Sequence, residues 1–225
     1  ANTFENFQCQ LEKYAHIGFK DYKMKISGRL INDKKNLGLL KKLVSRKNRI
    51  RVDANNLWHT SRGAIAYLMD LGGFFFAVEE PLYRKQYDAL RTVARALGCK
   101  IILDESFTRV EQFSQIRDDP ETWIVNLRVS KMGGILRSIN VAQVATLLGV
   151  PIIVGAQVGE TSILTRAALL IANTYRKSVL AQEGAFGTYL LKRDIVETPL
   201  MFGKGGILSV PPSVVKPGLG LDYIP

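Results

Sequence analysis

Three segments of the chain pass from apolar residues into an acid that could bind a cation: Asp53, Glu79 and Asp104. The acids are 26 and 25 residues apart, which is about the length of one strand, one helix and two short loops. Repetition of such a unit places the three carboxylates at the same end of neighbouring parallel strands. Because like charges repel, a cation is expected among them, and Mg²⁺ prefers such oxygen ligands, with Mn²⁺ as the alternative. The simpler explanation is three strands that happen to end in loop-facing acids.

The elements that must position these acids alternate along the chain. Apolar periodicity and helix-ending glycines predict helices at residues 2–16, 32–45, 60–71, 85–97, 110–116, 135–148 and 162–174. Strands are predicted at residues 21–26, 50–54, 74–79, 100–104, 123–129, 151–155 and 179–182. This alternation is typical of parallel βαβ units. No glycine-rich phosphate-binding motif follows an early strand, and polar residues follow many strands, so a TIM-type (β/α) barrel is favoured over a dinucleotide-binding fold.

The number of predicted strands is one fewer than a complete (β/α)₈ barrel requires. The chain starts inside a predicted helix, so the missing strand should be the first. A barrel that lacks a strand has two open edges and is a poor candidate for folding alone. We therefore expect one barrel domain over residues 1–225, with an N-terminal segment absent from this chain or supplied by another.

Composition narrows the class of protein. The net charge is +11, but the basic clusters fall on the helix predicted at 32–45 and its exit, without the interleaved aromatic residues that stack on bases, so nucleic acid is an unlikely partner. No apolar run is long enough to cross a membrane. Cys9 and Cys99 form no CxxC motif, which indicates reduced thiols in a cytoplasmic protein. The sequence is compatible with a homo-oligomer.

Four motifs resemble the enolase superfamily: Lys23-Met24-Lys25, Asp53-Ala54-Asn55, Glu79-Glu80-Pro81 and Asp104-Glu105-Ser106. They are most similar to its muconate-lactonizing branch, which includes o-succinylbenzoate synthases and dipeptide epimerases. The resemblance covers essentially the whole chain. It implies a C-terminal barrel domain that in the family is paired with an N-terminal α+β capping domain, which this sequence does not contain.

The resemblance also implies a chemistry for a small carboxylate substrate. Asp53, Glu79 and Asp104 would hold Mg²⁺, which binds the substrate carboxylate and stabilises the enolate formed when the α-proton leaves. The base would be Lys25, the second lysine of the pair. Lys23 lies two residues earlier on the same strand face, and its positive charge would make Lys25 easier to deprotonate. Without the acids, this lysine pair would be typical of a solvent-facing edge strand.

The chain departs from the family pattern at Arg128, where a lysine is expected to face Lys25 across the substrate. Arginine stays protonated and is a poor proton acceptor. Epimerisation needs two titratable groups, whereas a syn elimination of water can use one lysine, so Arg128 favours a lyase of the o-succinylbenzoate synthase kind. Lys131, predicted to lie in the loop before Gly133, could supply the second group of an epimerase or racemase; a cycloisomerase is the other alternative. An impaired catalyst that keeps the metal site is a third possibility.

Glu160 lies in the segment after the strand predicted at 151–155. Similar segments in the family line the substrate pocket, where Glu160 could donate a hydrogen bond or proton to the substrate carboxylate. Alternatively, Glu160 and Thr161 cap the following helix. A function of another class also stays open, namely a non-catalytic barrel that binds an anionic partner. Three clustered acids count against that function, because an anion binder has no use for them.

Overall fold

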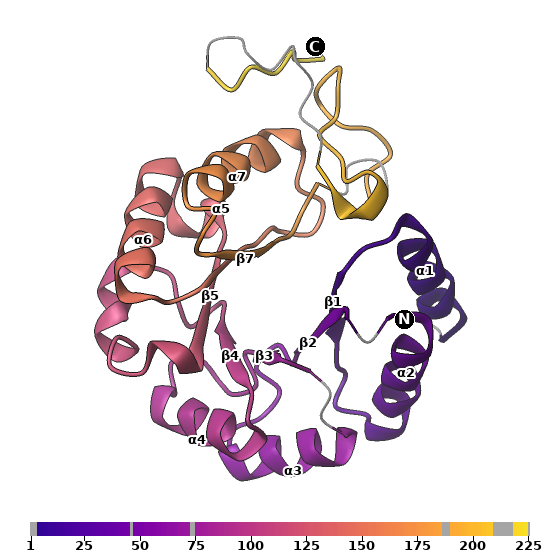
Figure 1. The fold of residues 1–225 in the computed structure, drawn as a ribbon, viewed down its shortest axis with the longest axis vertical. Coiled ribbons are helices and arrows are strands. Elements are labelled where there is room, and N and C mark those ends of the chain that lie inside the picture. The colour runs from indigo at the N-terminus through magenta and orange to yellow at the C-terminus, as the bar shows by residue number, and fades with distance from the viewer. Residues whose placement is uncertain (1–3, 46, 73–74, 186–189, 209–217, 225) are drawn as a thin grey trace. The chain divides into compact units, whose positions relative to one another are not determined.

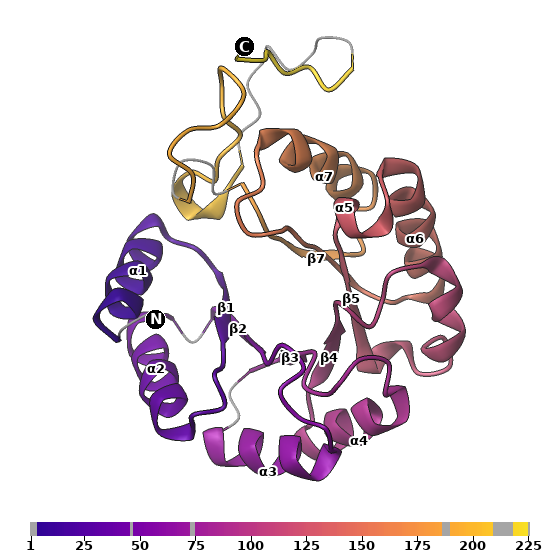
Figure 2. The ribbon, with the colours of Figure 1, turned by 180° about the vertical axis from the view of Figure 1, so that it is seen from behind.

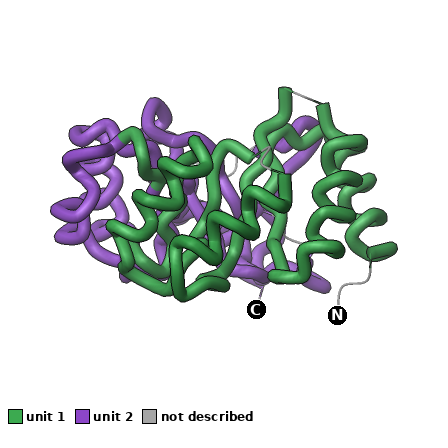
Figure 3. Tube along the Cα trace, turned by 90° about the horizontal axis from the view of Figure 1, so that it is seen from below, with its two compact units in different colours: residues 1–107, 121–124 green, residues 108–120, 125–225 purple. Residues whose placement is uncertain are grey.

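The computed structural model describes residues 4–45, 47–72, 75–185, 190–208 and 218–224. The chain divides into two compact units (Figure 3). The first contains residues 1–107 and 121–124, and the second contains residues 108–120 and 125–225. One domain over 1–225 therefore stays a prediction. No helix among the described residues is long and apolar enough to cross a bilayer.

The first unit alternates helices with parallel strands. Its elements are α1 (Phe4–Ile17), β1 (Asp21–Lys25), α2 (Leu30–Leu43), β2 (Arg49–Asp53), α3 (Ser61–Leu71), β3 (Ala77–Glu79), α4 (Tyr87–Leu97) and β4 (Lys100–Leu103). The strands pair in sequence order, β1 to β4, and every pair is parallel. Successive helices lie side by side, as α3 and α4 do in both Figure 1 and Figure 2.

The second unit continues the alternation. Its elements are η1 (Val110–Gln115), α5 (Val129–Met132), α6 (Ile135–Leu148), β6 (Ile152–Val154), α7 (Ser162–Thr174), β7 (Val179–Gln182) and η4 (Lys204–Gly206). The boundary between the units runs through β5 (Trp123–Leu127), after the short helix η2 (Pro120–Thr122). β5 pairs with β6, and β6 with β7, again in parallel.

Most predicted elements are confirmed to within a few residues, and those at 135–148, 162–174 and 179–182 have the predicted bounds. The strands could be predicted because they are runs of apolar residues. Val52, Ile101 and Val125, for example, are fully buried, and they are β-branched, as strand residues often are. Glycines end helices where a left-handed residue is needed, as Gly98 does after α4 with a φ of 61°. In the strand predicted at 74–79, Phe74 lies outside the described residues, and the observed strand β3 begins later, at Ala77.

The helix predicted at 110–116 is a 3₁₀-helix, η1. Two predictions near the end of β5 are wrong. The strand predicted to reach Val129 ends at Leu127, and α5 follows, so Lys131 lies in a helical turn and not in a loop. Val129 is β-branched and therefore resembles a strand residue, but it and Met132 are buried on one side of this single turn.

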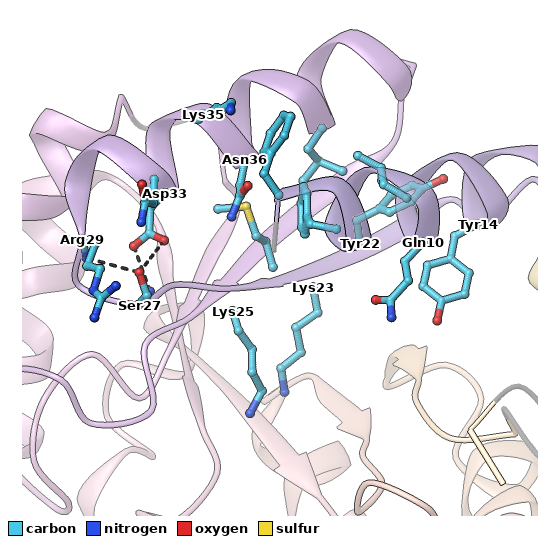
Figure 4. A pocket seen from close by; sticks show the side chains of 16 residues that line it. Gln10, Tyr14, Tyr22, Lys23, Lys25, Ser27, Arg29, Asp33, Lys35 and Asn36 are labelled. Atoms are coloured by element: carbon cyan, nitrogen blue, oxygen red, sulfur yellow. Dashed lines mark hydrogen bonds between the residues drawn. The ribbon is translucent and has the colours of Figure 1, made fainter. Parts of the chain in front are cut away.

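A buried carboxylate holds the connection between β1 and α2. Asp33 is 1% exposed. Its Oδ2 accepts hydrogen bonds from the backbone N–H groups of Ser27 and Gly28, at 2.8 and 3.2 Å, and from the Tyr67 hydroxyl at 2.6 Å. Its Oδ1 accepts from Ser27 Oγ at 2.9 Å (Figure 4). Burial of Tyr67 and its bond to Asp33 raise the pKa of that hydroxyl, so it stays a donor. One side chain thus ties the end of β1 to α2 and α3.

We expect Asp33→Ala to lower the free energy of unfolding by about 3 kcal/mol, because the donors of four partly buried hydrogen bonds lose the acceptor that they share. Urea unfolding followed by circular dichroism measures this loss. Asp70→Ala is the control, since Asp70 is exposed on α3 and should change stability by less than about 0.5 kcal/mol. Equal losses in both variants would show that Asp33 has no special structural role.

Candidate metal and acid–base site

Charged side chains form rows on one face of the first three strands. In parallel strands, residues in register point to the same side. The register defines three rows across the strands. The first row is Asp21 and Arg49, and the second is Lys23, Arg51 and Ala77. The third and last row is Lys25, Asp53 and Glu79. Alternation along β1 turns Tyr22 to the opposite side, and Figure 4 shows Lys23 and Lys25 pointing together, away from Tyr22. Acids and bases therefore meet on one face.

Lys23 links the two acids of the last row. Its Nζ lies 2.8 Å from Oε1 of Glu79 and 3.2 Å from Oδ2 of Asp53. The acid side chains are 1% and 5% exposed, so water screens their mutual repulsion little and a shared cation stabilises them. Lys25 is more peripheral: its Nζ is 3.8 Å from Asp53 Oδ2, and its side chain is 63% exposed. Lys25 is thus accessible, while Lys23 is held by the acids.

Arg51 is a buried charge that the sequence analysis did not single out. It is 4% exposed and occupies the same row as Lys23. Its Nη1 lies 3.9 Å from Oδ1 of Asp21, whose Oδ2 is 2.7 Å from Nη2 of Arg49. The sequence does contain a signal for this placement. Arg51 precedes Asp53 by two residues, so the two side chains must lie on the same face of β2.

Asp104 follows β4 directly and is 2% exposed. The register pairs Glu79 with Ile102, so Asp104 lies two residues, or about 7 Å, farther along its strand than the row of Glu79. Its backbone N–H donates to Oε1 of Glu80 at 2.6 Å. Glu80 also accepts from the backbone N–H and hydroxyl of Ser106, at 2.7 and 2.8 Å. Glu80 therefore fixes the main chain that carries Asp104.

The three predicted acids fit a divalent cation in chemistry, and two of them also fit in arrangement. All are buried carboxylates, the ligands that Mg²⁺ accepts, and Asp53 and Glu79 already converge on one cationic atom. Among the described residues, however, no three acidic, histidine or cysteine side chains are close enough together to hold an ion. Asp104 follows β4 and lies beyond the row of Asp53 and Glu79, so its side chain would have to approach theirs to complete a site.

A cavity of about 800 Å³ lies beside the lysines, between α1, β1 and α2. Apolar side chains from the two helices line it, including Phe4, Leu11 and Leu40, together with Lys23 and Lys25 (Figure 4). None of the three acids lines this cavity. The cavity is therefore separate from the place where the carboxylates converge, although the lysines border both.

The remaining predicted residues lie in the second unit, at the ends of β5 and β6. Arg128 donates from Nη1 to Oε1 of Gln157 at 2.9 Å, and the backbone N–H of Gln157 donates to Oε1 of Glu160 at 2.7 Å. Gln157 thus connects two predicted residues, a role that sequence reasoning missed. Lys131 donates from Nζ to the backbone carbonyl of Asn126 at 2.7 Å.

Burial raises the pKa of Glu160, while the Gln157 N–H and the charge of Arg128 act in the opposite direction and Glu183 raises it further. A carboxyl that holds its proton more tightly is suited to hydrogen-bond donation. Thr161 makes no side-chain cap bond to α7. Asp194 makes that contact instead, accepting from the backbone N–H and hydroxyl of Ser162 at 3.0 and 2.8 Å. The capping explanation for Thr161 is therefore wrong.

Residues 6–224 match the family described as Enolase C-terminal domain-like. The chain belongs to this family. The predicted membership of the enolase superfamily, made from four short motifs, is thereby confirmed, and the (β/α)-barrel fold class is that of its C-terminal domains.

Known members of the family include isomerases similar to this chain. An L-Ala-D/L-Glu epimerase of Bacillus subtilis is 26% identical over 98% of this chain and 59% of its own length. A chloromuconate cycloisomerase of Cupriavidus pinatubonensis is 28% identical over 78% of this chain and 45% of its own. A dipeptide epimerase from Cytophaga hutchinsonii, solved with Mg and D-Ala-L-Val, has a TM-score of 0.83 and 24% identity over 98% of this chain and 58% of its own. The chain thus spans about three fifths of the length of these two epimerases.

The raised pKa of Glu160 predicts a pH dependence of stability. The folded state binds this proton more tightly than the unfolded state, whose carboxyl has the ordinary value of 4.5. The contribution to stability is thus full below pH 4.5 and is lost as the pH rises through the folded-state pKa. We expect Glu160→Gln to gain stability relative to the wild type over that interval, measured as the difference in melting temperature from pH 4 to 8. A difference independent of pH would contradict the raised pKa.

Proposed function

We propose that this chain is the barrel part of an isomerase that removes the proton α to a carboxylate, with Lys25 as the base. The observation that carries the proposal is the row of Lys25, Asp53 and Glu79 on adjacent strands, in a member of the enolase family. Lys25 is exposed enough to reach a substrate and is held on a strand, so its Nζ is well placed to accept a proton. Lys23, on the same face, contributes positive charge next to it.

The buried acids are the proposed cation ligands. Asp53 and Glu79 would hold Mg²⁺ from adjacent strands, and Asp104 would join them from the end of β4. When bound, Mg²⁺ would supply positive charge that stabilises the negative charge left when the proton departs. The presence of Mg in the similar dipeptide epimerase supports this choice, with Mn²⁺ as the alternative. Glu80 would keep Asp104 in place through its bonds to the following loop.

The relatives favour an isomerase over the dehydration that Arg128 suggested. They are named as an epimerase and a cycloisomerase, which act on a dipeptide and on a chloromuconate, so a small carboxylate is the proposed substrate class. A cycloisomerisation can proceed with one lysine, which suits a chain whose Arg128 is bonded to Gln157. An epimerisation needs a second proton carrier, and Lys131 would have to leave the Asn126 carbonyl to serve.

A one-base elimination is the second candidate, because Arg128 can stabilise charge but cannot accept a proton. Identification of the product separates the candidates. An epimerase inverts the α-carbon and a cycloisomerase closes a ring at constant mass, whereas a lyase releases water. A non-catalytic barrel would do none of these; salt-dependent binding of nucleic acid retained after Asp53→Asn would support that alternative.

We expect calorimetry to detect saturable Mg²⁺ binding to the chain, weakened about tenfold or more by Asp53→Asn, since one of few charged ligands is lost. Asp70→Asn, which removes an exposed acid from α3, is the control and should bind as the wild type does. If the folded wild type binds no Mg²⁺, the proposed metal site is wrong.

We further expect Mg²⁺-dependent exchange of the substrate α-proton in D₂O, lowered about 100-fold or more by Lys25→Ala, because the base is removed. The substrates to screen are dipeptides and the lactones formed from muconates, in which the carbon next to a carboxylate carries an exchangeable proton, with exchange followed by mass spectrometry. Lys20→Ala, an exposed lysine just before β1, should leave the rate unchanged. Exchange that persists in Lys25→Ala would assign the base elsewhere.

A further inference from the structure

Lys23 occupies the place that a cation would take between the two converging acids. Its Nζ contacts one oxygen of each, Glu79 Oε1 at 2.8 Å and Asp53 Oδ2 at 3.2 Å. The register of the strands explains how Lys23 reaches both acids. Lys23 belongs to the row before the acids, and its long side chain runs along β1 to the next row. Its side chain is only 20% exposed, so the ion pairs are partly shielded from water.

The same oxygens cannot serve the ammonium and a metal ion together. Mg²⁺ requires oxygens at about 2.0–2.1 Å in near-octahedral order. An ammonium ion-paired with both Asp53 Oδ2 and Glu79 Oε1 would lie next to that ion and repel it, because little water separates two cations in a buried site. Binding of the metal through these two oxygens therefore requires the Lys23 ammonium to leave them.

We propose that Lys23 is a tethered competitor for the metal: its ammonium neutralises Asp53 and Glu79 until a divalent cation displaces it. The inference rests on the proposed function, since it concerns the same metal site. Lys23 and Lys25 point to the same side of β1 (Figure 4), so movement of the Lys23 ammonium off the acids changes the distribution of charge around Lys25. Metal occupancy and the surroundings of the base are thereby coupled.

The test is Mg²⁺ calorimetry on the wild type and on Lys23→Met, which keeps the length of the side chain and removes the charge. We expect Lys23→Met to bind Mg²⁺ about tenfold more tightly, because the metal no longer displaces a cation held by two buried acids. We also expect Mg²⁺ to raise the melting temperature of this variant more than that of the wild type, because its metal-free acids lack their counter-ion.

Lys25→Met is the matched control. It removes the same charge from the same face of the same strand, but Lys25 makes a longer contact with one acid only. A general electrostatic effect would tighten binding similarly in both variants, and that result would overturn the inference. A gain at least several-fold larger in Lys23→Met would support displacement.

A second measurement needs no substitution. In the wild type, modification of Lys23 by an amine-reactive reagent, quantified by mass spectrometry, should increase when Mg²⁺ is added, while modification of Lys20 stays constant. Unchanged reactivity of Lys23 in a chain that binds Mg²⁺ would overturn the inference and leave the proposed metal site intact. Absence of Mg²⁺ binding in both the wild type and Lys23→Met would overturn both the proposed metal site and the displacement of Lys23.

Discussion

Two buried carboxylates on adjacent strands cannot remain charged without a cation nearby, and this constraint organises the first unit. Asp53 and Glu79 are in register at the ends of β2 and β3, and both are almost fully covered. Their repulsion is offset by Lys23 from β1, and a second layer of charge follows in Arg51, Asp21 and Arg49. A strand face this rich in charge is costly for stability alone, because well-packed apolar residues would serve as well or better. A role in binding a ligand would account for the charged residues on this strand face.

The chemistry is distributed between elements that differ in rigidity. The lysines and two of the acids lie on strands, whose positions are fixed by ladders of hydrogen bonds, whereas Arg128, Gln157 and Glu160 lie where β5 and β6 pass into the next segments. Residues on strands suit a reaction step shared by a whole family, and residues at connections suit the choice of substrate. Gln157 and Glu160 therefore belong to the part of the chain in which family members are expected to differ, whereas Arg128 stands where the family pattern has a lysine.

The sequence predicted the alternation of strands and helices and the family, because apolar periodicity, terminal glycines and acid spacing are local signals. It placed Lys23 and Lys25 on one face, since strand geometry requires it. It did not reveal that Lys23 would bridge two acids, because that contact depends on the register of three strands. The same holds for Asp194 at the start of α7 and for the short helix α5, whose existence depends on burial of Val129 and Met132. Such contacts join residues far apart in the chain, where periodicity gives no information.

The bonds that Glu80 makes have a consequence for how the protein could change over time. Glu80, the residue that follows β3, anchors the main chain at Asp104 and Ser106. The Phe107 N–H adds a hydrogen bond to the Asp104 carbonyl at 3.1 Å. The segment that follows Phe107 can therefore lengthen, shorten or exchange its side chains while these bonds hold the acid in place. A lineage could in this way acquire new substrates by altering one loop, with the inherited carboxylates carried forward unchanged.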